Sequence, residues 1–243
     1  MLVDEPGLVI VPTSEVGRFA IFTSAIAGTV KTEGTLLDLR CSASVSENIN
    51  SSLREAFADH HAWVWIMGDD HVWGGDTLIR MLEILDDTTE ADVLVPLVVR
   101  RNPPWHPVLA FSEGRFDEHG HPLYKTVQWE QLPSEGVLEV DVAGSAGMLI
   151  RRHVIDALED PWFYSTPDEQ GRQAILNEDF TFCRDVTNQG FRIFATVDCV
   201  LGHLGIFNVR PLFRQGRWGA LTEFSTPEDQ FRHMFMPVEY SDA

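Results

Sequence analysis

The chain has little of what membrane proteins, disulfide-rich proteins and nucleic-acid-binding proteins require. No apolar run among its 243 residues approaches the roughly 18 residues of a membrane-spanning helix. Its three cysteines, Cys41, Cys183 and Cys199, have no zinc-ligand spacing, so neither a disulfide framework nor a cysteine metal site is expected. Only 18 Lys and Arg oppose 37 acidic residues, and the formal charge of −19 repels nucleic acid and anionic membranes.

The first residues also lack the features of a secretory leader. Residues 1–6 have neither a basic flank nor a long apolar core, so we expect a cytoplasmic protein with reduced cysteines. The 44% hydrophobic and 23% charged fractions are typical of a soluble globular protein. Because no internal repeat or convincing linker divides the chain, we expect one domain over residues 1–243.

Apolar runs alternate with helical patterns along the first hundred residues. The runs predict strands over residues 8–11, 35–39, 63–67 and 93–99, and helical spacing predicts helices over 51–59 and after Asp76. Pro96 lies inside the fourth strand and predicts a bulge or a sheet edge there. Later strands are expected at 137–142 and 192–196. Such alternation indicates an α/β fold with a mostly parallel central sheet flanked by helices.

The most informative segment runs from residue 63 to 73. Five apolar residues end at Gly68 and are followed by Asp69, Asp70 and His71. A strand buried on both faces of a parallel sheet delivers functional groups at its carboxyl end. Two carboxylates and an imidazole at that edge are suited to hold a divalent cation beside an anionic ligand. The alternative is a solvated turn whose acids face water.

Two later segments carry further candidate residues. Asn177 is a good helix cap, and Glu178 and Asp179 fall in the first turn, where the helix dipole favours acids. A helix start without catalytic role explains these acids equally well. His203 follows a strand, and as a single histidine it gains significance only beside other candidate ligands.

In this order, these residues resemble the family 2 glycosyltransferases and the wider GT-A fold, from about residue 8 to residue 205. The resemblance is carried by residues 10–14, Asn50, the turn 68–71, the loop 144–150, the acidic pair 178–179 and the late Gly202-His203. It departs at two positions: Ile49 replaces an arginine, and Gly68 stands where many members have an acid.

The resemblance implies a nucleotide-sugar donor bound with Mn²⁺ or Mg²⁺. Residues 1–99 would form the donor-nucleotide half, 100–205 the acceptor and catalytic half, and 206–243 a carboxy-terminal elaboration. The implied metal ligands are Asp70 with His203, or alternatively Asp69 with His71. The implied donor contacts are Pro12, Thr13, Ser14, Asp38, Asn50 and Asp69.

The resemblance also implies an inverting transfer in which Asp179 is the general base and Glu178 either orients it or contacts the acceptor. The implied acceptor side consists of Gly144, Ser145 and Ala146, with Trp105 and Trp162 as stacking surfaces for a sugar. The acceptor stays open between a glycan, a small molecule, a lipid-linked molecule and a modified DNA base, and the net charge disfavours the last. The oligomeric state is open as well.

Two other functions remain as alternatives. A protein of GT-A shape could bind a nucleotide or glycan without transferring sugar, and Gly68 and Ile49 favour that possibility. A nucleotidyltransferase on a related fold would need a glycine-rich loop after the first strand, but residues 13–18 contain only one glycine. The late arginines at 210, 214 and 217 either fold over a donor diphosphate or belong to an exposed elaboration.

Overall fold

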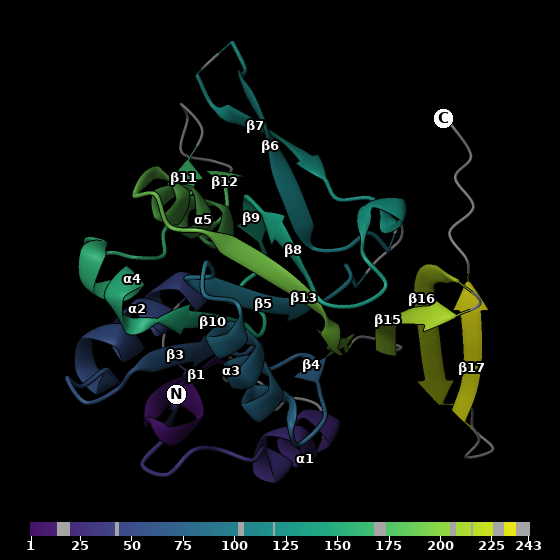
Figure 1. Ribbon diagram of the computed structural model, residues 1–243, viewed down its shortest axis with the longest axis horizontal. Coiled ribbons are helices and arrows are strands. Elements are labelled where there is room, and N and C mark those ends of the chain that lie inside the picture. The colour runs from purple at the N-terminus through teal and green to yellow at the C-terminus, as the bar shows by residue number, and fades with distance from the viewer. Residues whose placement is uncertain are drawn as a thin grey trace.

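The computed structural model describes residues 1–13, 20–41, 44–101, 105–118, 120–167, 174–204, 208–214, 216–225 and 231–236. At its centre is a seven-stranded sheet made of β1 (Gly7–Pro12), β2 (Leu36–Arg40), β3 (Trp63–Ile66), β5 (Val93–Leu97), β8 (Val137–Val140), β10 (Met148–Arg151) and β13 (Ile193–Val200) (Figure 1). The strands lie in the order β2-β1-β3-β10-β5-β13-β8. Five of these strands run in one direction, while β10 and β8 run against their neighbours. The predicted α/β fold is confirmed.

Helices cover both faces of this sheet. α1 (Ala20–Gly28) and α3 (Thr77–Asp87) pack on one face, and α2 (Val45–Ala56), α4 (Arg152–Ala157) and α5 (Glu178–Asn188) pack on the other. In β3, Trp63 and Trp65 face α1 and α3, whereas the aliphatic residues between and after them face the opposite layer. Burying one aliphatic side chain stabilises a fold by roughly 1.5–3 kcal/mol, so a strand buried on both faces favours a continuous apolar run.

Smaller sheets lie beside the central one. β4 (His71–Val72), β14 (Gly202–His203), β15 (Asn208–Arg214), β16 (Arg217–Ser225) and β17 (Phe231–Met236) form a five-stranded sheet, and β6 (Leu109–Phe116), β7 (Pro122–Thr126) and β9 (Val142–Ala143) form a three-stranded one. β11 (Thr166–Pro167) pairs with β12 (Ala174–Leu176), and short 3₁₀ turns lie at η1 (Leu2–Asp4) and η2 (Trp129–Gln131). Figure 1 shows β15 to β17 standing to the side of the central sheet. Within the described residues, none of the helices combines the length and apolarity needed to cross a bilayer.

The boundaries predicted for one helix and one strand were wrong, and the bulge predicted at Pro96 is confirmed. The helix predicted over 51–59 is α2, which begins at Val45 because the Ser44 hydroxyl caps it by accepting a hydrogen bond from the Glu47 amide at 3.3 Å. The strand predicted over 137–142 is split between β8 and β9, which belong to different sheets. Opposite Pro96, the register between β5 and β13 shifts after Thr196, which is the predicted bulge.

Asn50 was expected to contact a donor, but its amide holds the fold together. Its Nδ2 donates to the Phe163 carbonyl at 2.7 Å, and the Phe163 amide donates to its Oδ1 at 3.0 Å. The side chains of Asn50 and Phe163 are only 2% and 1% exposed. The pair therefore clamps the segment around residue 163 to α2, and its geometry gives no support to a donor contact.

We expect Asn50→Ala to destabilise the protein, because it leaves two buried main-chain groups of Phe163 without partners. Each such group costs about 1–3 kcal/mol, so Tm should fall by several degrees, at roughly 2–4 °C per kcal/mol for a chain of this size. Thermal unfolding measures this. The control is Asn188→Ala, an exposed amide on α5, which should change stability by less than about 0.5 kcal/mol. An unchanged Tm together with weakened nucleotide binding would contradict the structural role.

Candidate functional site

The turn after β3 has no room for a side chain at residue 68. A Cβ atom added to Gly68 would lie 2.8 Å from His71 Nδ1 and 3.1 Å from Asp70 Oδ1. A side chain at this position would therefore have to displace His71 and would crowd Asp70. The glycine that departs from the resemblance is thus required by the placement of Asp70 and His71.

Asp70, His71 and His203 form one cluster, in which the possible ligand atoms all lie within 4.8 Å of one another. The antiparallel pairing of β4 with β14 sets His71 directly opposite His203, and their rings stack at 4.3 Å. Asp70 Oδ1 lies 2.8 Å from His71 Nδ1, and Asp70 Oδ2 lies 3.3 Å from His203 Nε2. The Leu204 amide donates to the Asp70 carbonyl at 2.6 Å and fixes the backbone of the turn.

The protonation pattern of this cluster fits a divalent cation. His203 Nδ1 lies 3.0 Å from the Val99 carbonyl oxygen, which can only accept, so Nδ1 carries a proton and Nε2, 3.3 Å from Asp70 Oδ2, is the nitrogen that could serve as a ligand. Such a carbonyl contact is the usual way of orienting a metal-binding histidine. His71 is 5% exposed, and neither of its ring nitrogens has a well-aligned hydrogen bond, although Nδ1 lies close to Asp70. A bound cation would satisfy these buried groups.

The pKa values in the cluster also favour ligand forms. Burial lowers the pKa of His71, so its imidazole is neutral at pH 7. Burial alone would raise the pKa of Asp70, but the neighbouring His203 and His71 hold it below its usual range. An ionised carboxylate and a neutral imidazole, as at Asp70 and His71, are the forms that coordinate metals.

Asp69 points elsewhere. Its Oδ2 accepts a hydrogen bond from the Thr13 hydroxyl at 2.5 Å, just beyond the end of β1, and its side chain is buried. Of the two ligand sets left open by the sequence, the described structure groups Asp70 and both histidines, whereas Asp69 ties the turn to β1. Asn48, which sequence reasoning missed, also contacts this edge by donating to the Thr13 carbonyl at 3.4 Å. Sequence reasoning would have included Asn48 in this helix only if it had placed the helix start at the cap residue Ser44.

The remaining predicted donor residues differ in their surroundings. Pro12 is the last residue of β1 and is buried. Asp38 accepts a hydrogen bond from Arg40 Nε at 2.8 Å on the outer strand β2. Ser14 lies outside the described residues.

A cavity of about 170 Å³ connects the cluster with the predicted catalytic and acceptor residues. It is lined by His71, Val95, Pro96, Val98, Val108, Leu109, Ala143, Gly144, Ser145, Ala146, Asp179 and His203. Residues from β4, β5, β14, α5 and the loop after β9 thus meet in one place. A Cβ atom at Gly144 would lie 2.8 Å from Val108 and 3.8 Å from Asp179 Oδ2, so glycine keeps this wall open.

Asp179 has the basicity of a proton acceptor. Burial, followed by the nearby charge of Glu178, raises the pKa of Asp179 to about 6, even though the Phe180 amide donates to its Oδ1 at 2.9 Å. At pH 7 the group is therefore mostly ionised and can accept a proton. Glu178 does not line the cavity itself, in keeping with a residue that acts on Asp179 rather than on a ligand.

Arg101 was missed by sequence reasoning, since it lies in an irregular loop without a motif. Its Nη1 donates to Asp70 Oδ2 at 3.3 Å.

The late arginines lie at different distances from the cluster. Val209 in β15 pairs with His203, so the next residue, Arg210, lies close to the cluster. Arg214 instead pairs with Arg217 at the far end of the hairpin. Five residues at about 3.3 Å each put that end about 17 Å along the strand.

The two predicted acceptor-side tryptophans do not line the 170 Å³ cavity. Trp105 packs against the main core. The Trp162 indole donates to the Ile155 carbonyl at 3.0 Å and borders a different cavity, beside the carboxyl half of α5.

Comparison with known proteins gives one matching family model and many similar solved structures. A family model described as glycosyltransferase-like family 2 matches residues 21–218. The crystal structure of A197 from STIV is similar to this chain with a TM-score of 0.54 and 12% identity, covering 98% of this chain and 97% of that chain. At that identity the similarity concerns the fold alone. No curated protein matches.

The raised pKa of Asp179 predicts a pH-dependent stability difference. A carboxyl whose pKa rises on folding from 3.8 to about 6 contributes stability below pH 4 that is lost as the pH rises through 6. Asp179→Asn should therefore stabilise the protein more at pH 7.5 than at pH 4, by about 1–3 kcal/mol, given about 1.4 kcal/mol per pKa unit and some exposure to solvent. Thermal unfolding of both proteins at the two pH values measures it. The control, Asp87→Asn at an exposed position, should show little pH dependence, and a pattern like it in Asp179→Asn would contradict the raised pKa.

Proposed function

The chain belongs to the glycosyltransferase-like family 2, and from this premise we propose that it transfers a sugar from a nucleotide-sugar donor to an acceptor hydroxyl with inversion, using a divalent cation. The observation that carries the proposal is the cavity of about 170 Å³, in which Asp179 and two histidines of the candidate metal cluster line the same space. A general base and a group that neutralises the leaving diphosphate are the two requirements of this reaction.

Asp70, His71 and His203 would hold the cation. Two imidazoles and one carboxylate suit Mn²⁺ better than Mg²⁺, which prefers oxygen ligands. When bound, the cation supplies a Lewis acid that neutralises the charge of the departing nucleoside diphosphate. Thr13 and Asp69 are hydrogen-bonded to each other and hold the turn beside β1, where a donor nucleotide would bind.

Asp179 accepts the proton of the acceptor hydroxyl. Its pKa of about 6 leaves it ionised at pH 7 yet more basic than an ordinary aspartate, which is what a general base requires. Glu178 contributes the charge that raises this basicity. The open wall at Gly144 and the following Ser145 and Ala146 leaves space for the acceptor next to the base.

The proposed transfer inverts the anomeric carbon. Asp179 comes from α5 and the cluster from the turns after β3 and β13, so the proposed base and the proposed metal ligands are supplied by different elements. A hydroxyl activated on the side opposite the leaving diphosphate displaces it directly and inverts the anomeric carbon.

Asp70→Asn and His203→Ala should each weaken Mn²⁺ binding at least about tenfold, because disturbing even the supporting contacts of a metal site costs 10–100-fold in affinity. Titration of the protein with Mn²⁺, followed by electron paramagnetic resonance, measures this with and without uridine diphosphate. The matched control is His153→Ala, an exposed histidine paired with Asp92 far from the cluster, which should bind Mn²⁺ normally. Normal Mn²⁺ binding in both cluster variants would rule out this metal site.

Asp179→Asn should reduce sugar transfer by about 10²–10⁴-fold, the usual effect of losing a general base. Release of nucleoside diphosphate from a pool of nucleotide sugars, with water or mixed glycans as acceptors, measures it. Donor binding should be unchanged, since the diphosphate side of the site comes from other elements. Glu178→Gln should be less damaging. Near-normal transfer by Asp179→Asn would show that another group is the base.

A further inference from the structure

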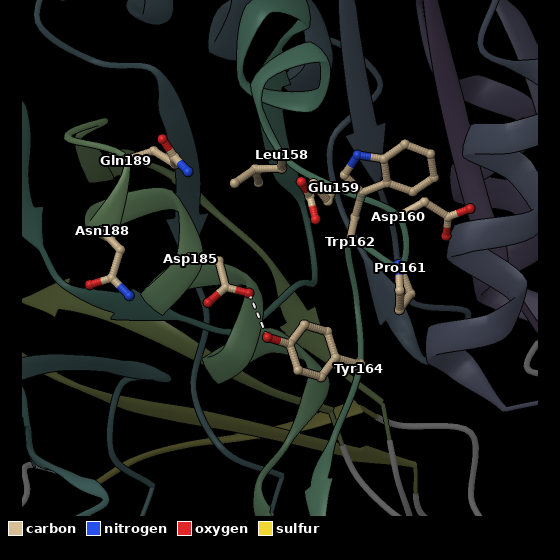
Figure 2. Close-up of a pocket in the computed structure, with 9 residues that line it drawn as sticks. All are labelled: Leu158, Glu159, Asp160, Pro161, Trp162, Tyr164, Asp185, Asn188 and Gln189. Atoms are coloured by element: carbon tan, nitrogen blue, oxygen red, sulfur yellow. Dashed lines mark hydrogen bonds between the residues drawn. The ribbon is translucent and has the colours of Figure 1, made fainter.

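A second and larger cavity, of about 510 Å³, lies between the segment 158–164 and the carboxyl half of α5. Its lining residues are Leu158, Glu159, Asp160, Pro161, Trp162, Tyr164, Asp185, Asn188 and Gln189 (Figure 2). It shares none of its lining with the cavity that contains Asp179. Its volume is in the range of ordinary small-molecule sites.

Two aromatic rings on its wall are held in place before any ligand binds. Phe163 is buried against Phe182, with ring centroids 4.3 Å apart, and is clamped by Asn50. Trp162 and Tyr164, on either side of Phe163, are only half-buried and line the cavity, and Trp162 also packs against that core. The Trp162 indole is fixed by the Ile155 carbonyl, and the Tyr164 hydroxyl donates to Asp185 at 2.8 Å.

The charges around this cavity are largely balanced. Arg54 donates two hydrogen bonds of 2.7 Å to Asp160, and Arg184 contacts both Asp185 and the Tyr164 hydroxyl. Two of the three carboxylates therefore already have cationic partners, which leaves Glu159. Among the described lining residues there is no Lys, Arg or His, so an anionic ligand such as a nucleotide finds no counter-charge here.

The remaining polar groups suit hydroxyls. Figure 2 shows the amides of Asn188 and Gln189 on one side, the rings of Trp162 and Tyr164 on the other, and the carboxylate of Glu159 between them. Amides donate and accept, carboxylates accept, and a hydroxyl does both. A sugar also has an apolar face that packs on aromatic rings.

We propose that this cavity binds a neutral saccharide, at a site separate from that of sugar transfer. The inference deepens the proposed function, since the natural ligand would be a distant part of a glycan acceptor, but the binding itself requires no transfer. α5 links the two sites. Asp179 lies in its first turn and Asp185 six residues later, about 9 Å along the axis at 1.5 Å per residue.

The test is binding of neutral trisaccharides (maltotriose, mannotriose and the trimer of N-acetylglucosamine) to the full chain, by saturation-transfer NMR and calorimetry. We expect at least one to bind, and Glu159→Ala and Gln189→Ala each to weaken it about 3–10-fold, the effect of losing one hydrogen bond. Both side chains are exposed, so these variants should fold. The control is Glu83→Ala, an exposed acid on α3, which should bind as the natural protein does.

Other outcomes separate this inference from the proposed function. Asp179→Asn should lose transfer but bind the saccharide normally. If no trisaccharide binds, or if binding does not depend on Glu159 and Gln189, the inference is overturned while transfer can stand. Stronger binding of spermidine, with the same dependence on Glu159, would identify a site for cations and would also overturn it. Saccharide binding without any transfer would support the inference and count against the proposed function.

Discussion

The pairing of β4 with β14 is the constraint on which the rest of the site depends. It joins Asp70 and His203, 133 positions apart in the chain, and brings two imidazoles and a carboxylate within reach of one cation. Each strand has only two residues, so the pairing is weak by itself. It persists because β14 continues β13 of the central sheet, while the turn before β4 is bonded to Leu204.

The pKa values of Asp70 and Asp179 are shifted in opposite directions by their surroundings. The histidines keep the pKa of Asp70 below its usual range, whereas burial beside Glu178 raises the pKa of Asp179 to about 6. Two acids with such different environments can divide the labour of a reaction, one as a permanent anion and one as a proton acceptor. The net charge of −19 adds a general preference for cations over anions, so the anionic donor proposed above would need a local cation beside Asp70.

α5 organises the part of the molecule that contains both cavities. Its first turn presents Asp179 to one cavity, its buried face packs Phe182 against Phe163, and its last turns border the second cavity. The Asn50 clamp fixes the opposite wall, so Trp162 and Tyr164 are held by contacts from two layers of the fold. Binding surfaces that are ordered in this way lose less entropy when a ligand binds.

The local sequence pattern was sufficient to predict part of the fold and several candidate site residues. The apolar run of β3, the glycine and acids that follow it, and the alternation of strands and helices predicted the α/β fold, because periodicity and turn chemistry act over a few residues. The same reasoning singled out Asp70, His203 and Asp179 as candidates. It could not anticipate contacts whose partner lies far along the chain. The Asn50 side chain accepts a hydrogen bond from the Phe163 amide, 113 positions away. The predicted strand 137–142 is split because its two halves join different sheets. Trp162 borders a cavity that forms only when α5 packs beside it. Such contacts are chosen by the packing of distant elements, so only the tertiary structure decided them.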